Sequence, residues 1–224
     1  MLVSALIAAS CGFGQASSPR TIKFSGYEWQ VKGSEGKVGP GPNFFDPSSE
    51  SVFVDAKGHL HLKVKKTEKG WTCSEVVLSK SLGYGTYTFT LASPPSALDD
   101  NLILGLFVYE DDTKEIDIEL AKWGDSSASN AQFVVQPYDR PGNMKRFSLP
   151  SAAKETTASF NWQKDSISFS AKTGSFSESW VYKGRDIPAP NKERAIINLW
   201  LMKGEKPKVE KEFEVVVSKF SFKK

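Results

Sequence analysis

Residues 115–120 read Glu115-Ile-Asp-Ile-Glu-Leu120, a strict alternation of acidic and apolar side chains. A helix is the alternative, because Glu115 and Glu119 are four residues apart, but two β-branched isoleucines two positions apart favour a strand. Successive side chains of a strand point to opposite faces. We therefore predict that Lys114 to Leu120 is extended, with its carboxylates on one face and a core-facing set of Ile116, Ile118 and Leu120 on the other.

Runs typical of strands recur on both sides of this segment, separated by turn signals. His59 to Lys65 alternates strictly, whereas Asn101 to Glu110 is almost entirely apolar, as expected for a strand covered on both faces. Further strands are predicted at 51–55, 71–79, 83–91, 132–136, 156–162, 166–171, 195–202 and 212–222. No amphipathic helix is found, and residues 148–155 form a helical turn at most. The pattern predicts an all-β sandwich.

The composition suits one such domain. The chain has 224 residues, of which 39% are hydrophobic, and all-β domains of this size commonly stay undivided. Six Trp, six Tyr and fifteen Phe can fill a core, and flat rings are also what a sugar-binding cleft needs. The net charge of +3 comes from 29 basic and 26 acidic residues that are well mixed. This argues against a nucleic-acid partner, which would require a strong basic patch.

The N-terminal residues predict export. Residues 1–16 form a short apolar run followed by small residues, too short to span a bilayer and typical of a signal peptide, although no Lys or Arg precedes the run. Cleavage after Ala16 would leave 17–224 as a free domain, and cleavage before Cys11 would leave a lipoprotein anchor. Both predict a secreted or periplasmic protein without a membrane span. Cys73 would then be the only cysteine of the soluble chain, and a buried thiol is expected.

The three acids suggest hydrolytic chemistry. A solvated acidic face is the alternative, but like charges close together destabilise a strand. Glycosidases need two carboxyl groups across the scissile bond, about 5–5.5 Å apart for retention of configuration. Residues four apart on a strand have Cα atoms roughly 13 Å apart, so a concave sheet and inward-leaning side chains are required. Crowding raises at least one pKa, which would keep one Glu protonated as the acid.

No metal or cofactor is expected. His59 and His61 are the only histidines, and a zinc site usually needs three or four ligands, so a plain polar face is the preferred interpretation. Gly39 to Asn43 contains glycines but no lysine at phosphate-loop spacing. A structural calcium ion would leave no readable pattern in this sequence.

Several segments resemble glycoside hydrolase family 16, and within it the bacterial licheninases. Glu115-Ile-Asp117-Ile-Glu119 matches the family signature of Glu, any residue, Asp, any residue, Glu. The other similar segments, which together cover about residues 24–222 in order, are Trp71 to Val76, Leu82 to Tyr87, Ala131 to Phe133, Ser159 to Gln163, Ser166 to Phe169 and Ile197 to Trp200.

The resemblance implies a concanavalin-like β-jelly roll with two antiparallel sheets and a cleft along the concave one. It implies that Glu115 is the nucleophile, that Glu119 is the acid/base and that Asp117 supports the pair. It also places Asn43, Glu75 and Trp200 among residues that contact sugars. Two more candidates are Trp123 and Gln136. Trp123, just after the acidic strand, could stack on a sugar or cap the core, and the resemblance puts Gln136 where the licheninases have a cleft Tyr.

This sequence also departs from the licheninases. The Trp expected two residues before the first Glu is Thr113, an expected Arg is Val77, and an expected cleft Asn is Val134. The acids are kept while much of the lining differs, so a different polysaccharide, or a shorter or differently decorated chain, is expected as the substrate. Two hypotheses remain: a retaining glycosidase acting as a monomer on a β-glucan or another wall or matrix glycan, and a non-catalytic lectin-like protein on the same fold.

Overall fold

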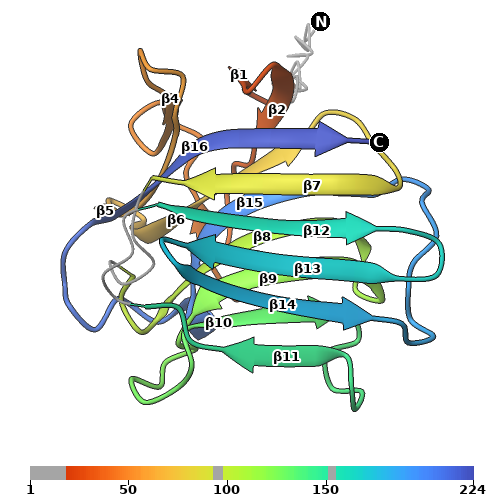
Figure 1. Cartoon of the computed structure of the whole chain (residues 1–224). Coiled ribbons are helices and arrows are strands. Elements are labelled where there is room, and N and C mark those ends of the chain that lie inside the picture. The colour runs from red at the N-terminus through yellow and green to blue at the C-terminus, as the bar shows by residue number, and fades with distance from the viewer. Residues whose placement is uncertain (1–18, 93–97, 151–154) are drawn as a thin grey trace, which may run out of the picture.

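The computed structural model describes residues 19–92, 98–150 and 155–224, which form sixteen strands in two antiparallel layers (Figure 1). The predicted leader and part of the 148–155 turn lie outside the described residues. The first sheet has the order β11 (Met144–Phe147), β10 (Ala131–Val135), β9 (Lys114–Ala121), β8 (Leu102–Asp111), β15 (Arg194–Leu201), β6 (Gly70–Leu78), β2 (Tyr27–Val31) and β1 (Thr21–Phe24).

The second sheet has the order β4 (Val52–Val54), β5 (Leu60–Thr67), β16 (Phe213–Lys223), β7 (Gly85–Leu91), β12 (Thr156–Trp162), β13 (Ile167–Thr173) and β14 (Phe176–Tyr182). The sheets are joined where β5 pairs with the start of β6, and β3 (Phe44–Phe45) adds a short parallel pairing to β6. This is the predicted all-β jelly-roll sandwich. The only helix of the described residues, the 3₁₀ turn η2 (Met202–Gly204), is far too short to cross a membrane.

Alternating side chains build the core between the sheets. On β9, Ile116, Ile118 and Leu120 are fully buried, as predicted. Aromatic rings join the layers: Phe133 of β10 stacks on Phe169 of β13 with 5.1 Å between ring centroids. Because the even-numbered positions of β9 face this core, its odd-numbered positions must face outward from the sandwich.

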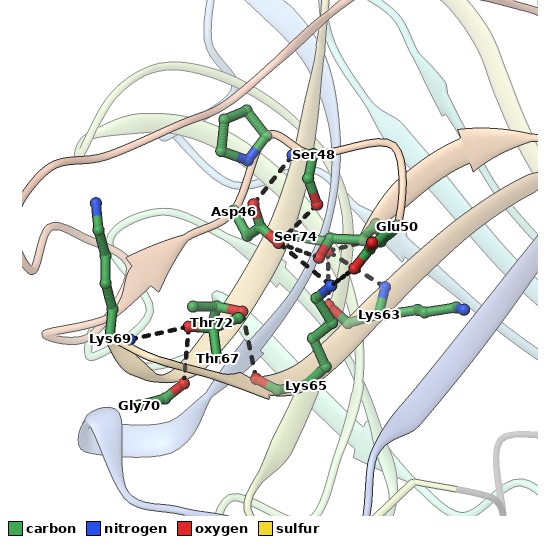
Figure 2. A network of polar contacts seen from close by, with 12 residues as sticks. Asp46, Ser48, Glu50, Lys63, Lys65, Thr67, Lys69, Gly70, Thr72 and Ser74 are labelled. Atoms are coloured by element: carbon green, nitrogen blue, oxygen red, sulfur yellow. Dashed lines mark hydrogen bonds and ion pairs between the residues drawn. The ribbon is translucent and has the colours of Figure 1, made fainter.

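The loop before β4 is fixed to β5 by a polar network (Figure 2). Asp46 accepts hydrogen bonds from the backbone and hydroxyl of Ser48, at 3.0 and 2.8 Å, and from the hydroxyl of Ser51 at 2.5 Å. The Lys65 ammonium lies 3.7 Å from Asp46 and 2.7 Å from Glu50. Burial works to raise the pKa of Asp46, but the hydroxyl and backbone bonds outweigh it, so the pKa is lowered and the ionised form is favoured.

Cys73 is fully buried on β6, and burial raises its pKa to about 12, so the expectation of an inert core thiol is confirmed. Trp29 and Trp162 are also core residues. Five strands were not predicted: β1, β2, β3, β11 and β14.

Candidate active site

A cleft of about 360 Å³ lies on the outer face of the first sheet. Strands β6, β8, β9 and β15 supply most of its floor, and Gly39 and Pro40 lie at one wall. Its lining includes five acidic residues and one basic residue: Glu75, Asp112, Glu115, Asp117, Glu119 and Lys32. The cleft therefore combines a strongly acidic floor with the aromatic side chains of Phe107, Tyr109 and Trp200.

β9 delivers three of the acids to this cleft. It is extended from Lys114 to Ala121, which confirms the predicted strand, and it pairs with β8 on one side and β10 on the other. Glu115, Asp117 and Glu119 all line the cleft, whereas the alternate residues enter the core. The central position of β9 in the sheet fixes the backbone on both sides, so the acids are held on a rigid element.

Asp117 is the most enclosed of the three, with 5% of its surface exposed. Burial raises its pKa well above the ordinary value, and the nearby charge of Glu115 raises it further. The protonated Asp117 donates a hydrogen bond to Glu115, and the Gln136 amide donates to Asp117 Oδ2 at 3.3 Å. The neutral form of Asp117 is therefore favoured, and in that form it donates a hydrogen bond to its neighbour.

Glu115 has its pKa raised to about 7. Burial is the main cause, and the charge of Glu119 adds to it, while the hydrogen bond from Asp117 works in the opposite direction because it stabilises the Glu115 carboxylate. A carboxylate with one donor and little water around it can act as a nucleophile above neutral pH.

Glu119 also has a raised pKa, caused by burial. Hydrogen bonds from Gln132 and from the Trp123 indole, the latter at 3.4 Å, lower it, as does the positive charge of Arg146. Burial thus favours the neutral form of Glu119, while its hydrogen-bond donors stabilise the anion. Both states are accessible, as a group that gives and later takes a proton requires.

A polar row continues from Glu119 across the floor. Register places Glu119 beside Gly105, Gly105 beside Asn198 and Asn198 beside Glu75. Asn198 accepts from the Gly105 backbone at 3.1 Å and donates to Glu75 Oε2 at 3.2 Å. Lys32 ends the row, 2.9 Å from Glu75 Oε1.

Gly105 provides the space for this row. A Cβ at this position would lie 2.5 Å from Asn198 Oδ1 and 3.2 Å from the Phe107 ring. Any side chain there would displace the Asn198 amide or fill the floor between Glu119 and Asn198.

The predicted sugar-contacting residues divide into three groups. Glu75 and Trp200 line the cleft. Trp123 and Gln136 are absent from its lining but bond directly to the carboxylates of Glu119 and Asp117. Asn43 is 3% exposed and does not line the cleft. Its side-chain amide donates to the carbonyls of Pro40 and Leu201 at 2.9 and 2.8 Å, so it holds the backbone of the cleft wall in place.

Sequence reasoning missed nine cleft residues: Lys32, Gly39, Pro40, Gly105, Phe107, Tyr109, Asp112, Ile196 and Asn198. A signal existed for Asn198, because it lies two residues before Trp200 on the same strand and must share its face. Tyr109 could be found likewise from the apolar run of β8, where it shares a face with Gly105 and Phe107. Lys32 and Asp112 lie beyond the ends of strands, where no periodicity places them.

Thr113 lies outside the cleft lining. It occupies the turn between β8 and β9, where its backbone and hydroxyl donate to Asp111 at 3.0 and 2.7 Å. The cleft therefore has no ring at this position, and its aromatic contacts come from Phe107, Tyr109 and Trp200 instead.

Neither His59 nor His61 lines the cleft. His61 bonds to Glu214 at 3.0 Å and to Asp55 at 3.3 Å, and its ring stacks on Phe53 with centroids 4.4 Å apart. Among the described residues, no group of three or more His, Cys, Asp or Glu side chains is arranged to hold a metal ion.

The structure is similar to solved β-glucanases. The Bacillus licheniformis β-glucanase is 18% identical with a TM-score of 0.68, over 94% of this chain and 100% of that one. A β-1,3-1,4-glucanase (lichenase) derived from a mouse hindgut metagenome is 15% identical with a TM-score of 0.66, over 87% and 92%. A β-1,3-glucanase from Mycobacterium marinum is 15% identical with a TM-score of 0.66, over 85% and 88%.

No protein-family model matches this sequence, and no curated protein matches it either. At such low identities the structural similarity shows a shared jelly-roll fold. Which activity the fold carries must be argued from the side chains in the cleft.

Proposed function

We propose that this protein is a secreted or periplasmic, retaining glycoside hydrolase of family 16 that cleaves β-glycosidic bonds in a polysaccharide. The observation that carries the proposal is the placement of Glu115, Asp117 and Glu119 along one central strand in the floor of one cleft. A site that only bound sugar would gain nothing from three mutually repelling acids. The similarity of the fold to β-glucanases makes a β-glucan-like chain the first substrate to test.

In the proposed reaction, Glu115 attacks the anomeric carbon while Glu119 gives its proton to the leaving oxygen. The glycosidic C–O bond breaks as the bond to Glu115 forms, which leaves a covalent glycosyl ester. Glu119, now ionised, takes a proton from water, and the hydroxide formed displaces Glu115. Asp117 donates its hydrogen bond to Glu115 throughout, which stabilises the departing carboxylate.

The charge of the cleft favours a neutral glycan. Five acids line it, and its single lysine, Lys32, is paired with Glu75. Sulfate or uronate groups would be repelled in a site from which much water is excluded. The hydroxyls of a neutral sugar can instead bond to Glu75 and Asn198, and the apolar face of its ring can stack on Trp200.

The test is cleavage of a panel of glycans: mixed-linkage and β-1,3-glucans, galactans, and alginate and carrageenan as anionic members. We expect reducing ends from neutral members only, product that first appears with retained anomeric configuration by NMR, and loss of cleavage in Glu115→Gln and Glu119→Gln. Glu178→Gln, on the second sheet, is the matched control. Activity should fall as the pH drops below about 7, because Glu115 then gains a proton.

Binding without cleavage, unaffected by either substitution at the acids, would support the lectin-like alternative. The observation that favours this alternative is the turn position of Thr113, which puts no ring in the cleft from the position two residues before Glu115. A product of inverted configuration would refute the double displacement while keeping the hydrolase.

A further inference from the structure

Three neighbouring strands place one residue each in a row at the edge of the first sheet. Register pairs Glu119 of β9 with Gln132 of β10, and Gln132 with Arg146 of β11. The Arg146 Nε donates to Gln132 Oε1 at 3.1 Å, and Gln132 Nε2 donates to Glu119 Oε2. Arg146 therefore reaches the candidate acid/base through one amide.

Arg146 determines which way this amide points. A guanidinium has only N–H donors, so it can bond only to the oxygen end of Gln132. The nitrogen end must then face Glu119. With the amide reversed, N–H groups would face N–H groups at Arg146, and Gln132 would offer an oxygen to Glu119 that only a protonated carboxyl could use.

Trp123 holds Arg146 in place. The guanidinium lies over the indole ring, 4.4 Å from its centroid, a favourable cation–π geometry. The Trp123 backbone has a φ of 48°, in the left-handed region that is uncommon for a bulky residue. This conformation directs the ring so that one edge donates to Glu119 Oε2 at 3.4 Å while one face supports Arg146.

The two hydrogen bonds to Glu119 end on the same oxygen. Gln132 and Trp123 both donate to Oε2. An oxygen that accepts two N–H groups is a poor place for a proton, so the proton of neutral Glu119 belongs on Oε1. Transfer to a leaving group would then take place from a defined atom of the carboxyl.

We propose that Arg146 is a positioning residue that, through the Gln132 amide, stabilises the anionic state of Glu119 and directs its proton to Oε1. The proposal rests on the assignment of Glu119 as acid/base made above. Trp123 then supports Arg146 and is not a free surface on which a sugar can stack, because Arg146 covers one face of its ring.

The test is Arg146→Met, compared with Lys145→Met. Lys145 is the adjacent cation of β11, but it bonds to Glu178 and to the Ser179 carbonyl, both on β14 of the second sheet. The two variants lose the same charge from the same strand. The ¹³C NMR titration of the Glu119 carboxyl, assigned with Glu119→Gln, gives a readout that needs no catalysis.

We expect Arg146→Met to move the Glu119 midpoint to higher pH and Lys145→Met to leave it in place. In an active enzyme, the alkaline limb of kcat/KM should move upward with that midpoint, and kcat should fall about tenfold. In a Gln132→Leu background the effect of Arg146→Met should shrink, because the relay is already cut.

An unchanged midpoint in Arg146→Met would overturn the proposal, as would an equal shift in Lys145→Met. If Arg146→Met shifted the Glu119 midpoint as far in the Gln132→Leu background as in the wild type, the charge of Arg146 would act without the amide, and the proposal would also fail. An inactive wild-type protein would refute the hydrolase function, yet the titration would still decide the role of Arg146.

Discussion

Replacing Glu115 by glutamine should stabilise the fold at alkaline pH. The pKa of Glu115 is about 7 in the folded protein, against an ordinary value of 4.5. The folded chain therefore binds more protons than the unfolded chain between these pH values, and stability falls as the pH rises through this window. Each pH unit corresponds to about 1.4 kcal/mol, so the ionised Glu115 costs about 3 kcal/mol above pH 7.

Glutamine removes that charge and keeps an oxygen to accept the hydrogen bond from Asp117. We expect the free energy of unfolding of Glu115→Gln to exceed that of the wild type by about 2–3 kcal/mol at pH 8. The difference should vanish at pH 4, where Glu115 is already neutral. Urea unfolding followed by Trp fluorescence at pH 4, 6 and 8 measures this directly.

Glu178→Gln is the matched control because its ionisation has the opposite effect. The Lys145 ammonium holds the pKa of Glu178 below its ordinary value, so Glu178 adds stability above that value and loses it as the pH falls. Glu178→Gln should therefore be slightly less stable than wild type at pH 8. Equal gains in Glu115→Gln at pH 4 and pH 8, or no gain at pH 8, would refute burial as the cause.

Three further substitutions test the frame around the acids. Gly105→Ala adds a Cβ 2.5 Å from Asn198 Oδ1; it should lower the unfolding free energy by about 1–3 kcal/mol and weaken glycan binding in calorimetry, whereas Gly36→Ala, with nothing within 4 Å, should be neutral. Asp46→Ala should cost about 1–3 kcal/mol at pH 7, with a smaller loss in thermal melts at pH 3, because a lowered pKa contributes stability only where Asp46 is ionised. Asn43→Ala removes the side-chain donor to two backbone carbonyls and should cost about 1–3 kcal/mol; unchanged urea unfolding with weakened glycan binding would instead make Asn43 a sugar ligand.

Strands with regular alternation could be predicted from the sequence. β9 and β5 alternate strictly, and both were placed to within two residues at each end. β14 was missed although Phe176, Glu178 and Trp180 share one face, because an edge strand leaves its inward residues half exposed and tolerates polar ones. β3 could not be found, since two residues in a parallel pairing carry no local pattern.

The residues of the candidate site also differ in whether their own segment of sequence could place them in the cleft. Glu75 and Trp200 could be placed in the cleft because the segments around them resemble those of family 16. Arg146 could not, because its approach to Glu119 depends on the register between β10 and β11, and Asn43 was expected among the sugar ligands where the structure uses its amide for the backbone. Contacts between strands depend on register, which a single sequence read strand by strand does not specify.

The neighbours of each acid, and not β9 itself, decide how the three carboxyls differ. Asp117 lies between Val134 and Phe107 on the adjacent strands, and neither side chain can bond to a carboxylate. Glu119 lies between Gln132, which donates to it, and Gly105, which leaves space beside it. Equal spacing along one strand thus yields one acid, Asp117, whose pKa is raised well above its ordinary value, and another, Glu119, in which hydrogen-bond donors oppose the effect of burial on the pKa. The same strand could support another division of roles if the residues of β8 and β10 changed, which is why the strand signature alone does not fix the chemistry.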